Sequence, residues 1–414
     1  MSVVRISLFS RFLVRWRILF GLAAVLLLTA AAHFVPQKWR DRQATSFHRQ
    51  CRELRDRKDW ATLASVAESW SHSDPRRADA WLFRAEAAQG QKNYVAAADF
   101  MFRIPAADAK AIPAFLQGAT ILLGNANRPI EGIEALQSLL KREPRVADAH
   151  RHLIQYYALT LQRRRLLQQI RFAIANDREP PESYVYLFLV DTLRLSNGVE
   201  MNRHWLEQYP DHETFLVASA LHMEEQREAA RRRASELKTN PNPTDLSKDS
   251  PPGRSQTVGE LFRRFPRNLE LLSYEIEQSL LVGDSDQVIS ILSQAPPEID
   301  DDNRFWRYKG QVHEAQGQMA EAESAYRTSA RMNPLDWRTW NNLATIERLK
   351  GHFTEVGRLQ KLVRQAENLR RQIRGLAVVE NVGSEWLRDF ADFAKNAGDD
   401  QIANALTRRL GTAR

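Results

Sequence analysis

The sequence holds one cysteine, Cys51, in 414 residues. No intrachain disulfide can form, and no metal site built from several cysteine ligands is possible. Glycine and proline are scarce: each occurs 17 times, about 4% of the chain where average use is about 7% and 5%. This scarcity argues against a fold rich in strands and tight turns, and favours helices joined by short connections.

Catalytic and nucleotide-binding motifs are absent as well. The chain has no HExxH, GxSxG, GxxxxGK[ST] or GxGxxG, so the sequence predicts no catalytic residue, no cofactor-binding residue and no cofactor. His150 and His152 stand two apart on an expected helix and point to different faces, so we expect no metal ligand there. The acidic run at 298–302 precedes a helix start, where carboxylates favour the helix dipole and need no bound cation.

A block of one charge sign is also missing. The formal net charge is +8, with 59 Lys and Arg against 51 Asp and Glu. The basic residues are scattered, apart from local runs such as Arg231-Arg232-Arg233. A nucleic-acid-binding protein gathers its basic residues on one patch or stripe. The sequence therefore predicts no nucleic-acid partner.

Residues 18–35 contain no charged side chain. As a helix they would span about 27 Å, close to the roughly 30 Å hydrocarbon core of a bilayer. Four arginines and no acidic residue precede them, and such basic flanks stay in the cytoplasm. We therefore expect a basic cytoplasmic segment at 1–17 and a single-pass signal anchor at 18–36. The remainder should lie on the periplasmic or outer side of a bacterial inner membrane.

A cleaved signal peptide is the alternative for this segment. The small residues at 30–32 offer an A-x-A cleavage site. Lys38, Arg40 and Arg42 follow the segment and reduce the charge asymmetry. In that case the protein is secreted. The long basic region ahead of the segment favours retention of the anchor.

Residues 306–334 place small and large apolar side chains at fixed offsets, and the spacing recurs. Trp306 is followed 34 positions later by Trp340, and Gly317 by Gly351. A period of 34 in a helical pattern is typical of stacked helical hairpins. We number the unit 303–336 so that Trp306 is position 4.

Each position of this unit has a physical reason. Small residues at positions 8 and 20 (Gly310 and Ala322) let the two helices of a hairpin cross at close range, and large residues at 4 and 24 fill the adjacent space. Gly317 at position 15 ends the first helix in a conformation that costs other residues more. Pro334 at position 32 stops the second helix from continuing.

This pattern resembles the tetratricopeptide repeat family. The units that fit lie at 44–77, 78–111, 113–146, 147–180, 269–302, 303–336 and 337–370. Cys51 falls on the small position 8, so we expect it to pack as a buried thiol. The resemblance implies an all-α fold, a tetratricopeptide-type α-solenoid of helical hairpins, here preceded by a single transmembrane helix.

The pattern weakens between the two groups of units and at the end. Residues 182–209 read as two helices and 212–237 as one, whereas 384–397 and 399–410 read as a pair that caps the final apolar face. The resemblance covers most of the chain from residue 44 onward.

A proline-rich stretch at 238–257 divides the repeats. It has four prolines and no periodic apolar residue, so it reads as a linker or loop. A long excursion inside one continuous solenoid is the alternative. We therefore expect an N-terminal array at 44–237 and a C-terminal array with capping helices at 258–411.

The resemblance implies a non-catalytic scaffold that binds protein or peptide partners in a concave groove lined by the first helix of each hairpin. The alternative is an enzyme with its active site in the irregular region 182–268, the repeats recruiting substrate. The residues expected along the groove are Arg304, Arg307, Gln311, Arg338, Asn341, Asn342 and Arg348. Arginine grips carboxylates bidentately, so this set favours an acidic peptide.

Overall fold

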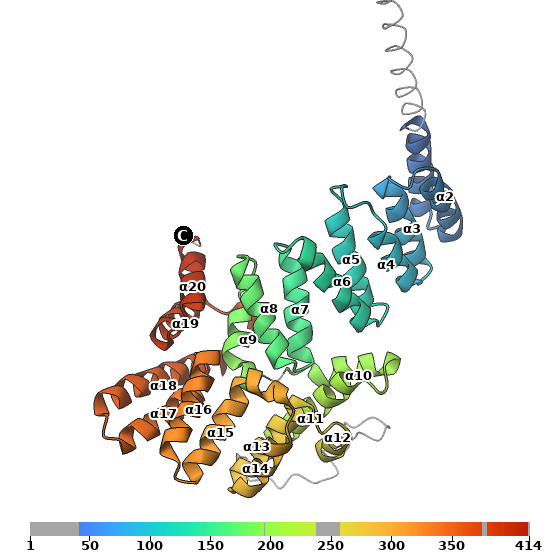
Figure 1. Cartoon of the computed structure of the whole chain (residues 1–414). Helices are drawn as coiled ribbons and strands as arrows, with labels where there is room; N and C mark the ends of the chain where they lie inside the picture. The colour runs from blue at the N-terminus through green and yellow to red at the C-terminus, as the bar shows by residue number, and fades with distance from the viewer. Residues whose placement is uncertain (1–40, 194, 237–256, 375–378, 413–414) are drawn as a thin grey trace, which may run out of the picture. The chain divides into compact units, whose positions relative to one another are not determined.

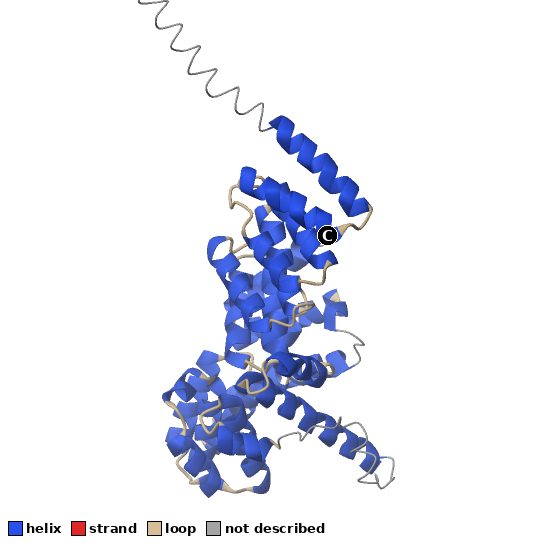
Figure 2. Cartoon of the chain, turned by 90° about the vertical axis from the view of Figure 1, so that its right-hand side faces the viewer, coloured by secondary structure: helices blue, strands red, loops and turns tan. Residues whose placement is uncertain are grey.

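The structure is a computed structural model that describes residues 41–193, 195–236, 257–374 and 379–412. Every regular element in these ranges is helical (Figure 2), which confirms the predicted all-α architecture there. The predicted anchor at 18–36 lies outside the described residues, as does the predicted linker except for Thr257. Among the described helices, none is both long and apolar enough to cross a bilayer.

The chain divides into two compact units, residues 1–126 and 127–414. This division falls inside the repeat predicted at 113–146. In the first unit, consecutive helices pack against one another, and Cys51, Trp70 and Phe83 form part of a buried cluster. After helical residues 41–56 its helices are α2 (Trp60–Ser73), α3 (Ala78–Gly90), α4 (Tyr94–Phe102) and α5 (Ala111–Leu123).

The second unit continues the pattern of paired helices (Figure 1). Its N-terminal helices are α6 (Pro129–Arg142), α7 (Ala147–Leu159), α8 (Arg163–Ala175), α9 (Ser183–Leu189), the 3-10 turn η1 (Val190–Thr192), α10 (Gly198–Gln208) and α11 (Glu213–Glu236). Its C-terminal helices are α12 (Val258–Arg264), α13 (Leu269–Val282), α14 (Ser285–Gln294), η2 (Pro297–Asp301), α15 (Asn303–Ala315), α16 (Met319–Met332), α17 (Trp337–Leu349), α18 (Phe353–Arg374), η3 (Val379–Asn381), α19 (Ser384–Ala397) and α20 (Asp400–Thr412).

The hairpins turn on one residue in the left-handed backbone conformation. At position 15 of the C-terminal repeats this residue is glycine, as predicted: Gly317 and Gly351 have φ of 73° and 76°. At the same position of earlier repeats, Lys58, Lys92 and Leu161 adopt the conformation with φ of 57°, 60° and 52°. The N–H of the next residue donates to a carbonyl five residues back, which closes the end of the first helix.

Position 4 supplies a second recurring contact. The indole N–H groups of Trp81, Trp306 and Trp340 each donate to the backbone carbonyl six residues earlier, at 2.9, 2.9 and 2.7 Å. His150 makes the same contact through Nε2 to the Pro144 carbonyl, at 2.8 Å. Residues of different size therefore share one polar contact, which ties each first helix to the loop before it.

The close approach predicted at Gly310 is confirmed. A Cβ added there would lie 2.4 Å from Cε1 of the Tyr326 ring, which is closer than packed carbon atoms can come. Tyr326 and Ala322 are both fully buried. In this unit the neighbour that forbids a side chain at Gly310 is thus Tyr326, since its ring lies across the glycine.

The C-terminal pair α19 and α20 packs on two surfaces. It follows α18, as predicted for a cap, and α20 also contacts α8. The Phe188 ring of α9 lies 5.5 Å from the Phe390 ring of α19 and 6.1 Å from Trp386, measured between centroids. Arg171 of α8 donates to both carboxylate oxygens of Asp399, at 3.3 and 2.6 Å. Segments about 200 residues apart are therefore joined in this unit.

Candidate functional site

The residues predicted to line a groove fall into two groups. Arg304 and Arg307 are buried, each only 2% exposed. The remaining five are half-buried or exposed: Gln311, Arg338, Asn341, Asn342 and Arg348. The two groups have different chemistry, because the buried arginines are neutralised by carboxylates of the same chain.

Arg304 joins α15 to α13. Its two terminal nitrogens donate to the two carboxylate oxygens of Glu270, both at 3.0 Å. It also donates to Asp302, which caps the N-terminus of α15 by accepting from the Arg304 backbone N–H at 3.0 Å. Arg163, the first residue of α8, forms an ion pair with the same Glu270. One carboxylate thus connects three helices.

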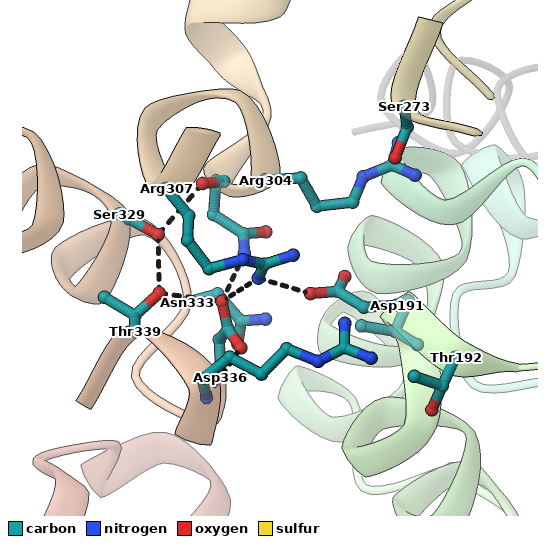
Figure 3. Close-up of polar contacts among 12 residues, drawn as sticks. Asp191, Thr192, Ser273, Arg304, Arg307, Ser329, Asn333, Asp336 and Thr339 are labelled. Atoms are coloured by element: carbon teal, nitrogen blue, oxygen red, sulfur yellow. Dashed lines mark hydrogen bonds and ion pairs between the residues drawn. The ribbon is translucent and has the colours of Figure 1, made fainter. Parts of the chain in front are cut away.

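Arg307 joins α15 to α17 and to η1. Figure 3 shows its guanidinium group between two carboxylates, those of Asp336 and Asp191. The Nη1 atom lies 3.1 Å from the Asp191 Oδ2. Asp336 in turn accepts from the Thr339 hydroxyl at 2.7 Å and caps α17 through the Arg338 backbone N–H at 3.2 Å.

Burial makes this network depend on complete pairing. Although burial alone would raise the pKa of Asp191, the charges of Arg307, Arg304 and Arg338 hold it below its ordinary value. Burial would likewise lower the pKa of Arg307, but Asp336 and Asp191 raise it well above its ordinary value. Asp191 and Arg307 are therefore charged at neutral pH, and Nη1 of Arg307 donates to both carboxylates within the chain.

This geometry changes how the predicted groove is understood. Arg304 and Arg307 hold repeats of this chain together, and the stripe does not present them on its surface. The sequence pattern missed their partners because Asp191 and Glu270 lie far away in the sequence. The role predicted for the other five residues stays a prediction. Among them, Gln311 Oε1 and Asn342 Nδ2 are buried atoms with no hydrogen-bond partner in the described part of the chain.

A separate cavity of about 580 Å³ lies between α6, α7 and α8 and extends to His212, just before α11. Cavities that bind small molecules commonly measure about 300–1,000 Å³. Its polar walls include Gln137, Gln168 and Gln169, with Arg165 on the same helix as the last two. The repeat pattern does not predict this cavity, and the run of polar residues on α8 is the one local sign of it.

Several polar groups around this cavity are already oriented. Gln137 donates to the Tyr157 hydroxyl at 2.7 Å, and Gln169 contacts His150 Nδ1 at 2.7 Å. Since His150 Nε2 faces a carbonyl that can only accept, Nε2 carries the proton and Nδ1 accepts from Gln169. Burial lowers the pKa of His150, which favours this neutral form.

Two side chains at the cavity lack full contacts among the described residues. The Nδ1 atom of His212 is buried and has no hydrogen-bond partner there. Burial lowers the pKa of this histidine, against the raising effect of Glu213, so the imidazole is neutral at neutral pH. Phe172 on the cavity wall is 41% exposed. The cavity therefore combines an exposed apolar ring with a buried imidazole nitrogen that has no hydrogen-bond partner among the described residues.

The residues considered as possible catalytic or metal-binding groups have structural roles in the described part of the chain. Cys51 is fully buried, and burial followed by the nearby Glu86 carboxylate raises the pKa of its thiol to about 11. In the region 182–268, Asp191 pairs with Arg307, and Glu182 with Arg151. Among the described residues, no three His, Cys, Asp or Glu side chains gather as a metal site would require.

Comparison with known proteins agrees with the repeat pattern. The family model of the tetratricopeptide repeat matches residues 295–336 and 309–355, so this stretch contains tetratricopeptide repeats. No curated protein matches the sequence.

Solved structures similar to this chain include two repeat proteins. A tetratricopeptide repeat protein from Parabacteroides merdae is 10% identical, with 73% of this chain and 98% of that chain covered and a TM-score of 0.25. Yeast Tom70 is 12% identical, with 91% of this chain and 77% of that chain covered and a TM-score of 0.27. At these TM-scores neither likeness carries an argument about how the repeats of this chain are arranged.

Proposed function

We propose that this protein is a non-catalytic scaffold, tethered to a membrane by residues 18–36, that binds a segment of a partner protein in the cavity between α6, α7 and α8. The tetratricopeptide repeats at 295–355 favour protein binding as the general role, because such repeats build extended surfaces from stacked hairpins. The tether and its placement in a bacterial inner membrane rest on the sequence of the first 36 residues.

The cavity itself carries the proposal. It combines the half-exposed Phe172 ring with side-chain amides and with Arg165, whose Nη1 donates only to Gln162, at 2.9 Å, among the described residues. A bound peptide presents apolar side chains together with backbone N–H and C=O groups. Those backbone groups need partners once water is excluded. Amides and a neutral imidazole can supply both donors and acceptors.

The test is affinity capture from membrane extract with the full-length chain, followed by measurement of Kd for the identified partner. Phe172→Ala combined with Arg165→Ala should weaken that partner at least tenfold, because both residues line the cavity. Phe353→Ala is the matched control, since Phe353 is 72% exposed and does not line this cavity. Unchanged affinity of the double variant would place the binding site elsewhere, whereas small-molecule turnover without any partner would favour the enzyme alternative.

A further inference from the structure

Two guanidinium groups lie over the indole of Trp337, the first residue of α17. The guanidinium carbon of Arg370 lies 5.0 Å from the ring centroid, and that of Arg338 lies 5.9 Å away. Arg374 follows one turn after Arg370 near the end of α18. We call Trp337, Arg338, Arg370 and Arg374 the Trp337 patch. Arg374 is exposed and the other three are half-buried.

Asp191 acts on Arg338 and Glu367 acts on Arg370, so the charge of this patch is only partly balanced by the residues that the structure describes. No carboxylate among those residues lies within ion-pair distance of Arg338, Arg370 or Arg374, whereas the neighbouring Arg304 and Arg307 have two carboxylates each. Burial, and then the like charges of Arg338 and Arg374, lower the pKa of Arg370, whereas Glu367, three residues earlier on α18, opposes this. The guanidinium groups therefore repel one another.

Such an arrangement is unfavourable for the free protein. Like charges brought together outside bulk water raise the free energy of the folded state. Arg338 also stands in the first turn of α17, where the helix dipole disfavours a cation. A bound anion would remove both costs, because it would pair with the guanidinium groups and meet the positive end of the helix.

We propose that the Trp337 patch binds an acidic segment of a partner protein, with two or more carboxylates on the arginines and an apolar side chain against Trp337. Arginine binds carboxylates through two parallel hydrogen bonds, and the accessible part of the half-buried indole gives apolar contact. A nucleic acid needs a stripe that follows many phosphates, whereas this patch is centred on a single ring. The proposal rests on the proposed protein-binding function, and it specifies that the segment bound at the Trp337 patch is acidic.

The test uses the full-length chain and a fluorescein-labelled peptide of alternating Glu and Leu, read by fluorescence anisotropy. Arg370→Gln with Arg374→Gln should weaken the peptide at least tenfold, because it removes two of the three cations. The matched control is Arg364→Gln with Arg371→Gln, which removes the same charge from exposed positions of the same helix. This control should leave the affinity within about twofold. Raised salt should weaken binding to the unmutated protein.

Three results would overturn the proposal. The first is failure of the acidic peptide to bind the unmutated chain, and the second is equal loss of affinity in the control variant. The third is tighter binding of a single-stranded DNA 20-mer than of the peptide, abolished by the Arg370 and Arg374 substitutions, which would assign the patch to nucleic acid. A version of the peptide with Gln in place of Glu should not bind.

The outcome can be separated from that of the proposed function. Capture of a partner that depends on Phe172 and Arg165, with no binding of the acidic peptide, would remove only the inference about the Trp337 patch. Peptide binding that depends on Arg370 and Arg374, with no partner captured through the α6–α8 cavity, would remove only the cavity proposal. The two sets of substituted residues lie on different helices, so each variant reports on one site.

Discussion

At Gly310 the absence of a side chain is required by the ring of Tyr326. We predict that Gly310→Leu lowers the free energy of unfolding by about 1–3 kcal/mol, since overpacking forces the ring or the backbone to move. Urea unfolding followed by far-UV circular dichroism measures this. Gly357→Leu is the matched control: Gly357 is exposed in α18, and an added Cβ meets nothing within 4 Å. Equal destabilisation by both substitutions would mean that the ring contact is unimportant.

Single residues were predictable from the sequence where one period decides them. Gly310, Gly317 and Trp306 take the positions expected for a hairpin, because each is constrained by neighbours within the same unit. The left-handed conformation of Leu161 was not predicted, since its side chain disfavours that conformation. Only the need to turn between α7 and α8 explains it, and that need comes from the packing of the pair.

Between elements, buried ion pairs connect helices that are not consecutive. We predict that Arg307→Met lowers the free energy of unfolding by about 3–5 kcal/mol, because Asp336 and Asp191 would remain buried without their cation. Thermal or urea unfolding measures the change. Arg348→Met is the control, since Arg348 is exposed on α17. A loss below about 1 kcal/mol in Arg307→Met would show that the pair is dispensable.

Acid should weaken the ion pair between Arg307 and Asp191. The pKa of Asp191 is lowered in the folded state, so its stabilisation is complete above the ordinary pKa of about 3.9 and is lost as the pH falls through the lower folded value. We predict that the stability difference between the unmutated protein and Asp191→Asn is constant from pH 7 to about 5 and shrinks below about 4. Urea midpoints at several pH values measure it. A difference that stays constant down to pH 2.5 would contradict the assignment.

At this scale the sequence predicted which helices exist better than what they contact. The pair at 384–397 and 399–410 was located correctly, because its apolar period is strong. On α15 the predicted stripe should present Arg304 and Arg307 on a groove surface, but both arginines are buried. Position within a repeat gives the direction of a side chain, whereas burial depends on which distant helix packs there, and Asp191 carries no local signal for that.

Across the second unit, the contact of α19 with α9 joins the C-terminal end of the row of repeats to a much earlier helix. We predict that Phe390→Ala, which truncates a fully buried ring, speeds hydrogen exchange at 183–190 as well as at 384–410. Deleting such a ring typically costs about 3–5 kcal/mol. Phe353→Ala should change neither region, because Phe353 is largely exposed. Faster exchange confined to 384–410 would mean that the cap stabilises only its own end.

A linear repeat pattern could not have predicted this contact. In a solenoid each repeat contacts only its neighbours, so the period gives no reason to pair α9 with α19. One local signal existed: residues 184–190 are a short run of aromatic and aliphatic side chains, and α9 is almost entirely buried. A helix apolar on every face needs covering on every side, although its covering partner cannot be read from that run.

The contact between α9 and α19 also bears on how the chain emerges during synthesis. A ribosome adds about 5–20 residues each second, so roughly 200 residues separate the appearance of Phe188 from that of Phe390, a delay on the order of 10–40 seconds. Throughout that interval the Tyr184 and Phe188 rings lack the helix that covers them in the finished fold. The nascent chain therefore exposes an apolar surface to which chaperones can bind. A prematurely terminated product would keep this surface exposed.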